Sequence, residues 1–144
     1  ADPEDWPLGM KQVTSGRHQT DADWEVVPEG MYELLKWINA TYHPKKIIIT
    51  ENGAANNDWI NQDGKVEDPN RIDYLRQYLT AINQAMNEGV PVKGYYVWCF
   101  CDNFEWAWGL SRRFGIVYVD YPTQKRIPKA SAYWLSDVIK NNGF

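Results

Sequence analysis

Hydrophobic residues recur along the first half of the chain with the spacing first of a helix and then of a strand. From Pro28 onward, apolar side chains lie three or four positions apart, which predicts an amphipathic helix that stops before Pro44. Its apolar positions are Met31, Leu34, Leu35, Ile38 and Tyr42. Residues 47–50 are three isoleucines and a threonine, and this short run predicts a buried strand.

The second half repeats this order of helix and strand. Asp68 followed by Pro69 is typical of a helix start with Asp68 as the N-cap, and Gly89 is typical of a helix end. The apolar positions between them are Ile72, Leu75, Leu79, Ile82 and Met86. Residues 92–100 are nearly all apolar along their later half, which predicts a strand buried on both faces, as in a parallel sheet.

The end of the chain predicts more β structure and a last helix. Residues 114–121 read as extended, and residues 122–125 form a turn into a further short segment. Pro128 then precedes a helix whose inward positions are Leu135, Val138 and Ile139.

Alternating βα units predict an α/β fold with a parallel sheet. Two apolar strands would leave both sheet edges unpaired, so we expect the closing portion of a larger α/β protein. Residues 1–27 show no sustained period and predict an irregular loop segment, whereas residues 28–144 hold the last βα units. No separate second domain is expected.

Composition narrows the range of partners. The formal net charge of −4 argues against a nucleic-acid partner, whose phosphates need a basic face. No apolar run approaches the ~20 residues of a membrane-spanning helix, and the acidic start of the chain does not resemble a signal peptide. We therefore expect a soluble, cytoplasmic protein.

The two cysteines, Cys99 and Cys101, lie in one apolar run. On a strand they would share a face and be too close in sequence for a relaxed disulfide. A metal site would need further ligands, and His18 and His43 are distant in sequence, so two packed thiols are the favoured interpretation. We expect no metal and no cofactor.

A carboxylate stands where the first predicted strand ends. Glu51 follows the isoleucine run, and Asn52 and Gly53 after it allow a sharp turn. In a (β/α)8 barrel the C-terminal ends of the strands carry the chemistry, and a strand gives a nucleophile a rigid mount. Taken alone, the position also suits a helix cap or a surface residue.

A second carboxylate follows the next strand among aromatic residues. Glu105 lies between Phe104 and Trp106, and this pairing of acceptor oxygens with flat apolar faces suits a sugar. The alternative from the residues alone is an ion pair of Glu105 with Arg112 or Arg113 among ordinary core aromatics.

Two long motifs carry a family resemblance. The stretches "IIITENGAA" and "WCFCDNFEWAWGLSRRFGIVYVDYPTQKRIPKASAYW", with the earlier "TDADWEVVPEGMYELL", closely resemble the C-terminal third of the family 1 glycoside hydrolases, the β-glucosidase and β-galactosidase group. The resemblance implies strands seven and eight of a (β/α)8 TIM barrel, incomplete as a single chain. It also implies a retaining β-glycosidase that acts on terminal β-linked glycosides.

The resemblance also implies roles for individual residues. Glu51 stands at the place of the catalytic nucleophile. Trp98 would form the floor against the sugar ring, and Glu105 would accept hydrogen bonds from the 4- and 6-hydroxyls. Trp106 would donate its indole N–H to the 3-hydroxyl, and Phe114 would line the same pocket. One departure is Cys99, where the family usually has Ser.

The catalytic acid of the family comes from an Asn-Glu-Pro motif that these residues lack. We therefore expect a complementary N-terminal chain to supply it, and an isolated chain that is inactive. The Glu105-Trp106 pair favours unphosphorylated β-glucosides over 6-phosphorylated sugars, while glucose, galactose and fucose stay open. A non-catalytic carbohydrate-binding or scaffold fragment is the alternative function.

Overall fold

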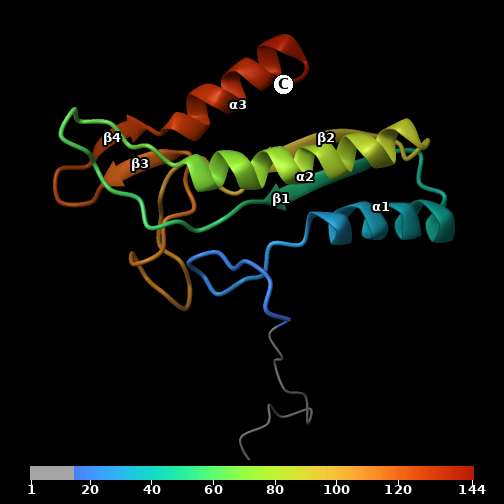
Figure 1. Cartoon of the computed structure of the whole chain (residues 1–144), viewed down its shortest axis with the longest axis horizontal. Coiled ribbons are helices and arrows are strands. Elements are labelled where there is room, and N and C mark those ends of the chain that lie inside the picture. The colour runs from blue at the N-terminus through green and yellow to red at the C-terminus, as the bar shows by residue number, and fades with distance from the viewer. Residues whose placement is uncertain (1–14) are drawn as a thin grey trace, which may run out of the picture.

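The computed structural model describes residues 15–144, in which helices and strands alternate up to β2 (Val92–Val97) and a pair of strands and a last helix follow (Figure 1). The expected helix boundaries at Pro28, Pro44 and Pro69 are confirmed, and Gly89 follows the second helix. Residues 15–27 contain no regular helix or strand, and the first part of the predicted irregular segment lies outside the described residues. The elements are α1 (Pro28–Tyr42), β1 (Ile47–Asn52), α2 (Pro69–Asn87), β2 (Val92–Val97), β3 (Val117–Asp120), β4 (Lys125–Pro128) and α3 (Ala130–Asn141).

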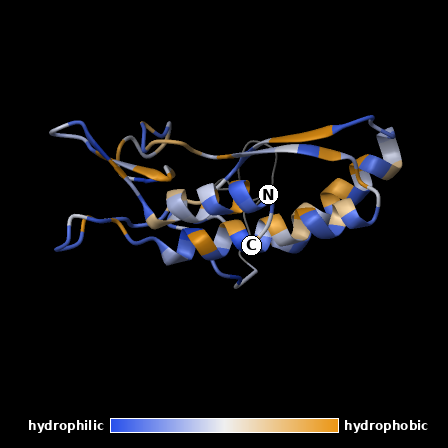
Figure 2. Ribbon diagram, turned by 90° about the horizontal axis from the view of Figure 1, so that it is seen from above, coloured by the Kyte–Doolittle hydropathy of each residue, from blue (hydrophilic) through white to orange (hydrophobic). Residues whose placement is uncertain are grey.

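β1 and β2 form a parallel pair, as the βα alternation predicts. Ile47 and Ile49 of β1 pack toward α1 and α2, in a core that also contains Leu35, Ile82 and Val92. In Figure 2 the two strands form one layer, and within the described part of the chain the helices lie on one side of it only.

The other face of this strand pair is open. Ile48 is 45% exposed and Tyr96 is 63% exposed, although each lies between two more buried neighbours along its strand. The prediction that β2 is buried on both faces is therefore wrong for these residues by themselves, because no described segment packs on that side.

The predicted strand over residues 92–100 ends earlier, at Val97. Trp98 still donates its N–H to Asn52 of β1 (2.9 Å), but the next N–H groups turn to another partner. Cys99 donates to Phe114 (3.1 Å) and Asp102 donates to Val117 (3.0 Å). The chain changes its hydrogen-bonding partner at Trp98, which a run of apolar residues cannot reveal.

The remaining predicted β segments form a hairpin, since β3 pairs antiparallel with β4. The last helix, α3, follows as expected, but Ile139 is 72% exposed instead of inward. Met86 near the end of α2 is likewise 44% exposed. Residues 15–144 therefore leave both side chains largely uncovered. No helix in this range is both long and apolar enough to cross a membrane.

Candidate active site

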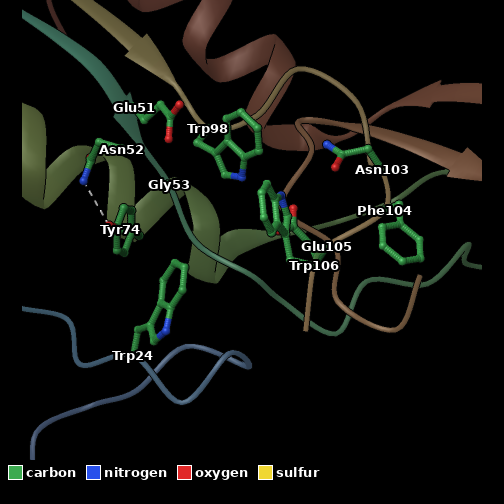
Figure 3. A pocket seen from close by; sticks show the side chains of 10 residues that line it. All are labelled: Trp24, Glu51, Asn52, Gly53, Tyr74, Trp98, Asn103, Phe104, Glu105 and Trp106. Carbon is green, nitrogen blue, oxygen red and sulfur yellow. Dashed lines mark hydrogen bonds between the residues drawn. The ribbon is translucent and has the colours of Figure 1, made fainter. Parts of the chain in front are cut away.

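The C-terminal ends of β1 and β2 open into a cavity of about 570 Å³ (Figure 3). Four of the five predicted site residues line it, namely Glu51, Trp98, Glu105 and Trp106. The wall therefore combines two carboxylates with indole rings, which is the pairing that suits an amphipathic ligand such as a sugar.

Glu51 is held near the end of β1, where the register with β2 shifts between Ile49 and Asn52. Its side chain is exposed in this chain and lies beside Trp98 in Figure 3. No described residue forms a hydrogen bond or an ion pair with this carboxylate. It is therefore open to a ligand in the cavity.

The neighbouring Asn52 is fixed by two phenols. Its Nδ2 donates to the hydroxyl of Tyr74 (3.0 Å; Figure 3). Its Oδ1 accepts from the hydroxyl of Tyr95 (2.9 Å). Burial raises the pKa of both Tyr74 and Tyr95 above the ordinary value of 10.0, so both phenols stay protonated near neutral pH. This anchoring of Asn52 holds the strand end that carries Glu51.

Gly53 allows the two strand ends to meet. A Cβ at position 53 would lie 1.6 Å from the carbonyl oxygen of Trp98, which is far inside contact distance. The peptide between Trp98 and Cys99 is cis. Only a residue without a side chain fits this contact, and the contact places Trp98 next to Glu51.

Glu105 lies in a tight turn that closes on Gly109. Its N–H donates to the carbonyl oxygen of Gly109 (2.7 Å), and the N–H of Gly109 donates back to the carbonyl of Glu105 (2.6 Å). The residue is only 9% exposed, and its buried Oε1 has no hydrogen-bond partner among residues 15–144. A buried carboxylate oxygen without a donor is costly, so this atom is a strong candidate acceptor for a ligand.

The ion pair considered for Glu105 is not formed among the described residues. Arg113 instead pairs with Asp102 at 2.7 Å and places its guanidinium 3.9 Å from the ring centroid of Tyr118. The Nε of Arg112 is buried without a partner in the described range. Both arginines therefore leave the carboxylate of Glu105 free.

The two tryptophans differ in exposure. Trp98 is 36% exposed and Trp106 is 96% exposed, so the ring of Trp106 stands free at the rim in this chain. Phe114 is not among the lining residues; it is 1% exposed and packs under Trp24, with ring centroids 5.5 Å apart. Since Trp24 lines the cavity, Phe114 supports the cavity wall by packing against Trp24.

Six lining residues were not among the site residues predicted from the sequence. Asn52 and Gly53 belong to the Glu51 motif, and Asn103 and Phe104 to the Glu105 motif, so their proximity to the two acids was the available signal. Trp24 belongs to the earlier motif that begins at Thr20, and Tyr74 comes from α2, where no local signal marked it. The six are Trp24, Asn52, Gly53, Tyr74, Asn103 and Phe104.

The chain is similar to known glycosidases over nearly all of its length. The family model described as Glycosyl hydrolase family 1 matches residues 5–144. A 1,4-beta-D-glucan glucohydrolase of Thermotoga neapolitana is 55% identical over 137 residues, which cover 95% of this chain and 31% of that protein. Beta-glucosidase A of Thermotoga maritima is 54% identical over 139 residues, covering 96% of this chain and 31% of that protein.

Solved structures agree with the sequence comparison. The beta-glucosidase from Thermotoga maritima in complex with noeuromycin matches with a TM-score of 0.93 at 54% identity, covering 97% of this chain and 32% of that one. The chain thus spans about a third of the length of the relatives that it matches, and it is a partial α/β unit of their barrel fold.

Proposed function

The chain belongs to glycosyl hydrolase family 1, and from this we propose that it is the C-terminal part of a retaining β-glycosidase, a β-glucosidase in preference to a phospho-glycosidase. In this proposal β1 and β2 are strands seven and eight of a (β/α)8 barrel. The parallel pairing of β1 with β2, and the helices on one side only, are what two neighbouring barrel strands require.

Glu51 is the proposed nucleophile. Its ionised carboxylate attacks the anomeric carbon of a terminal β-glycoside and forms a glycosyl-enzyme ester as the leaving oxygen departs. A second carboxylic acid protonates that oxygen and then takes a proton from the water that cleaves the ester. In a retaining enzyme the two carboxyl groups lie ~5 Å apart.

The observation that carries the proposal is the buried Oε1 of Glu105, which has no donor among residues 15–144 and lines the same cavity as Glu51. The 4- and 6-hydroxyls of a sugar would supply the missing donors. Trp98 would pack against the ring and Trp106 would donate its indole N–H to the 3-hydroxyl, with Phe114 supporting the wall. No metal or other cofactor is needed for this chemistry.

The acid catalyst must come from elsewhere in the barrel. No Asn-Glu-Pro tripeptide occurs in the sequence, and its Asn87-Glu88 pair lies at the end of α2, away from the cavity. We propose that an N-terminal portion carries this acid and the other strands. We use the term assembled barrel for this chain together with that portion.

The alternative is a carbohydrate-binding or scaffold unit in which Glu51 only accepts a sugar hydroxyl. The exposed position of Glu51 would permit this role as well. The two functions differ in one measurable respect, because only a nucleophile becomes covalently attached to the sugar.

The test is mechanism-based labelling of the assembled barrel with a 2-deoxy-2-fluoro-β-glucoside that carries a good leaving group. Catalysis predicts the added mass of one fluoroglucosyl group on Glu51, found by mass spectrometry of peptides, and loss of activity in step with labelling. The Glu51→Gln variant serves as the control and should take no label. A folded wild-type barrel that binds glucosides and remains unlabelled would support the binding unit instead.

A further inference from the structure

A group of buried charged residues lies outside the cavity, behind the loops that carry the two acids. We call Asp58, Asp68, Arg71, Asp102 and Lys129 the buried ion cluster, and each is at most 8% exposed. None of them lines the cavity or can touch a ligand there. The cluster therefore has no part in the chemistry proposed above, and its geometry needs a separate explanation.

Lys129 joins two loops through one ammonium group. The residue is 0% exposed, and its Nζ donates to Asp58 Oδ2 (2.6 Å) and to Asp102 Oδ1 (2.8 Å). Asp58 belongs to the loop after β1, and Asp102 belongs to the segment after β2. One side chain at the start of α3 thus links the loop that follows Glu51 to the loop that carries Glu105.

Arg71 extends the same link to the start of α2. Its guanidinium pairs with Asp58 (2.7 Å) and with Asp68, and donates to the carbonyl oxygen of Arg113 (2.8 Å). The carboxylate of Asp68 accepts from the N–H (2.8 Å) and the hydroxyl (2.6 Å) of Ser131. Asp68 stands at the N-cap position predicted from the sequence, but its side chain joins α3 instead of capping α2.

Asp102 passes this restraint to the Glu105 loop. Its Oδ1 also accepts from the N–H of Gly115 (3.0 Å), and a Cβ at position 115 would lie 2.2 Å from the backbone nitrogen of Asp102. The backbone of Asp102 is therefore in close contact with Gly115, while its side-chain Oδ1 is held by the ammonium of Lys129 and the N–H of Gly115. Glu105 follows three residues later, so the direction of its turn depends on this base.

Buried ion pairs contribute little net stability, because the loss of hydration offsets much of the attraction. Burial lowers the pKa of Lys129, and the nearby Arg71 lowers it further, while Asp58 and Asp102 oppose both effects. The firm consequence of the cluster is geometric, since each hydrogen bond fixes a direction. An effect on function is thus expected to exceed the effect on stability.

We propose that Lys129 is a positioning residue of the sugar site, which acts on Glu105 through Asp102. The inference rests on the proposed function for its link to sugar binding. Glu105 is expected to accept a hydrogen bond from the 6-hydroxyl of a glucoside. A β-xyloside has no 6-hydroxyl and cannot form this hydrogen bond. Loosening the base of the loop should therefore harm the glucoside more than the xyloside.

The experiment compares Lys129→Met with Lys140→Met in the assembled barrel. Lys140 lies on the same helix with its side chain 69% exposed, so its loss controls for the removal of one lysine from α3. Concentrations of active sites are set by titration with the fluoroglucoside, which removes any difference in folded fraction. For Lys129→Met we expect kcat/KM to fall about 10-fold more for the p-nitrophenyl β-glucoside than for the β-xyloside, and for Lys140→Met we expect no change.

A double-variant cycle with Glu105→Gln identifies the route. If Lys129 acts through Glu105, both substitutions remove the same interaction with the 6-hydroxyl. The double variant then loses no more selectivity for the glucoside over the xyloside than the worse single variant. Equal losses for the two substrates, or fully additive losses, would overturn the proposal. Should Lys129→Met fail to fold, Asp102→Asn keeps the side-chain shape while weakening the same link, and the same pattern is required of it.

Hydrogen exchange separates this inference from the proposed function. In Lys129→Met the backbone amides of residues 103–110 should exchange faster, while those of α1 keep their rates. Faster exchange in a barrel whose wild type takes no fluoroglucosyl label would leave the positioning role standing and reject the function. Normal labelling with unchanged exchange and unchanged selectivity would reject the positioning role alone.

Discussion

Glu51 and Glu105 line one cavity but have opposite surroundings. Glu51 is exposed at a strand end, whereas Glu105 is 9% exposed and closed into a turn. A carboxylate that is open to the cavity can reach a reacting atom. A buried carboxylate instead gains most from a hydroxyl that satisfies its oxygens. These two environments support the proposed division into a nucleophile, Glu51, and a hydroxyl acceptor, Glu105.

Cys99 shows how closely the site is packed. Burial, together with the nearby carboxylates of Glu105 and Asp102, raises the pKa of its thiol from 9.0 to about 12. The amide of Asn103 lies 3.1 Å from its sulfur, and the sulfur lies 3.1 Å from the carbonyl oxygen of Cys101. A thiol in this setting stays protonated and unreactive near neutral pH.

We therefore predict that Cys99 resists alkylation in the folded protein. Iodoacetamide at pH 8 should modify it at least ~10-fold more slowly in the assembled barrel than in denaturant, because so little thiolate is present. Mass spectrometry of the peptide that contains both cysteines measures the rate at each site. Equal rates in the folded and the denatured protein would contradict this expectation.

The same shift affects stability at high pH. Since the folded pKa of Cys99 lies above the unfolded one, its contribution to stability is present below pH ~9 and is lost as the pH rises toward 12. The Cys99→Ser variant, which lacks the thiol, should lose less stability between pH 9 and 11 than the wild type. Unfolding midpoints measured across this range test the sign.

At the scale of elements, the close contact of β1 with the end of β2 depends on Gly53. Gly53→Ala would place a methyl group 1.6 Å from the carbonyl oxygen of Trp98, so the two strand ends must separate. We expect a loss of about 3 kcal/mol in the free energy of unfolding. Gly143→Ala, which meets nothing within 4 Å, is the matched control and should change it by less than ~0.5 kcal/mol.

Denaturant unfolding of the assembled barrel provides the measurement. Because Trp98 also forms the proposed floor of the sugar site, Gly53→Ala should weaken inhibitor binding as well. A variant that unfolds at the wild-type midpoint would show that the strands have room to move apart without loss.

The elements that were predicted well are those whose signals are local. Proline and glycine at helix ends, and apolar positions every three or four residues, located α1 and α2 because a helix bonds within its own segment. The predicted end of β2 was wrong because the backbone changes its hydrogen-bonding partner at Trp98. That change depends on the distant segment 114–117. Where a strand ends therefore depends on tertiary contacts, which the local sequence does not show.

The site was predicted in part for the same reason. Glu51 lies at the end of β1 and Glu105 lies in the segment that follows β2, so their meeting at one edge could be expected from parallel strands. The buried ion cluster could not be predicted. Asp58, Asp102 and Lys129 lie far apart in the sequence, where each resembles an ordinary surface charge. Tyr74 was missed similarly, since its role appears only when α2 packs beside Asn52.

At the scale of the whole molecule, the described residues leave an apolar face without cover. Ile48, Tyr96 and Phe100 are between 45% and 70% exposed, and the two-stranded sheet of β1 and β2 has two free edges. Unpaired strand edges beside apolar side chains bind other chains readily. In the proposed barrel, neighbouring strands would pair with both free edges, and the rest of the barrel would cover the apolar face.

This geometry predicts that the isolated chain associates with itself. Size-exclusion chromatography should show oligomers or aggregates whose size grows with concentration, and circular dichroism should show a broad thermal transition instead of a cooperative one. Adding the complementary N-terminal portion should convert these species to a single complex, because the barrel strands then pair with both edges and cover Ile48 and Tyr96.

Ile48→Lys offers a matched variant: it places a charge on the exposed face, so the isolated chain should associate less while the assembled barrel is harmed. A compact monomer that melts cooperatively without any partner would show that these residues cover their own apolar face, and would remove the physical reason for a complementary portion.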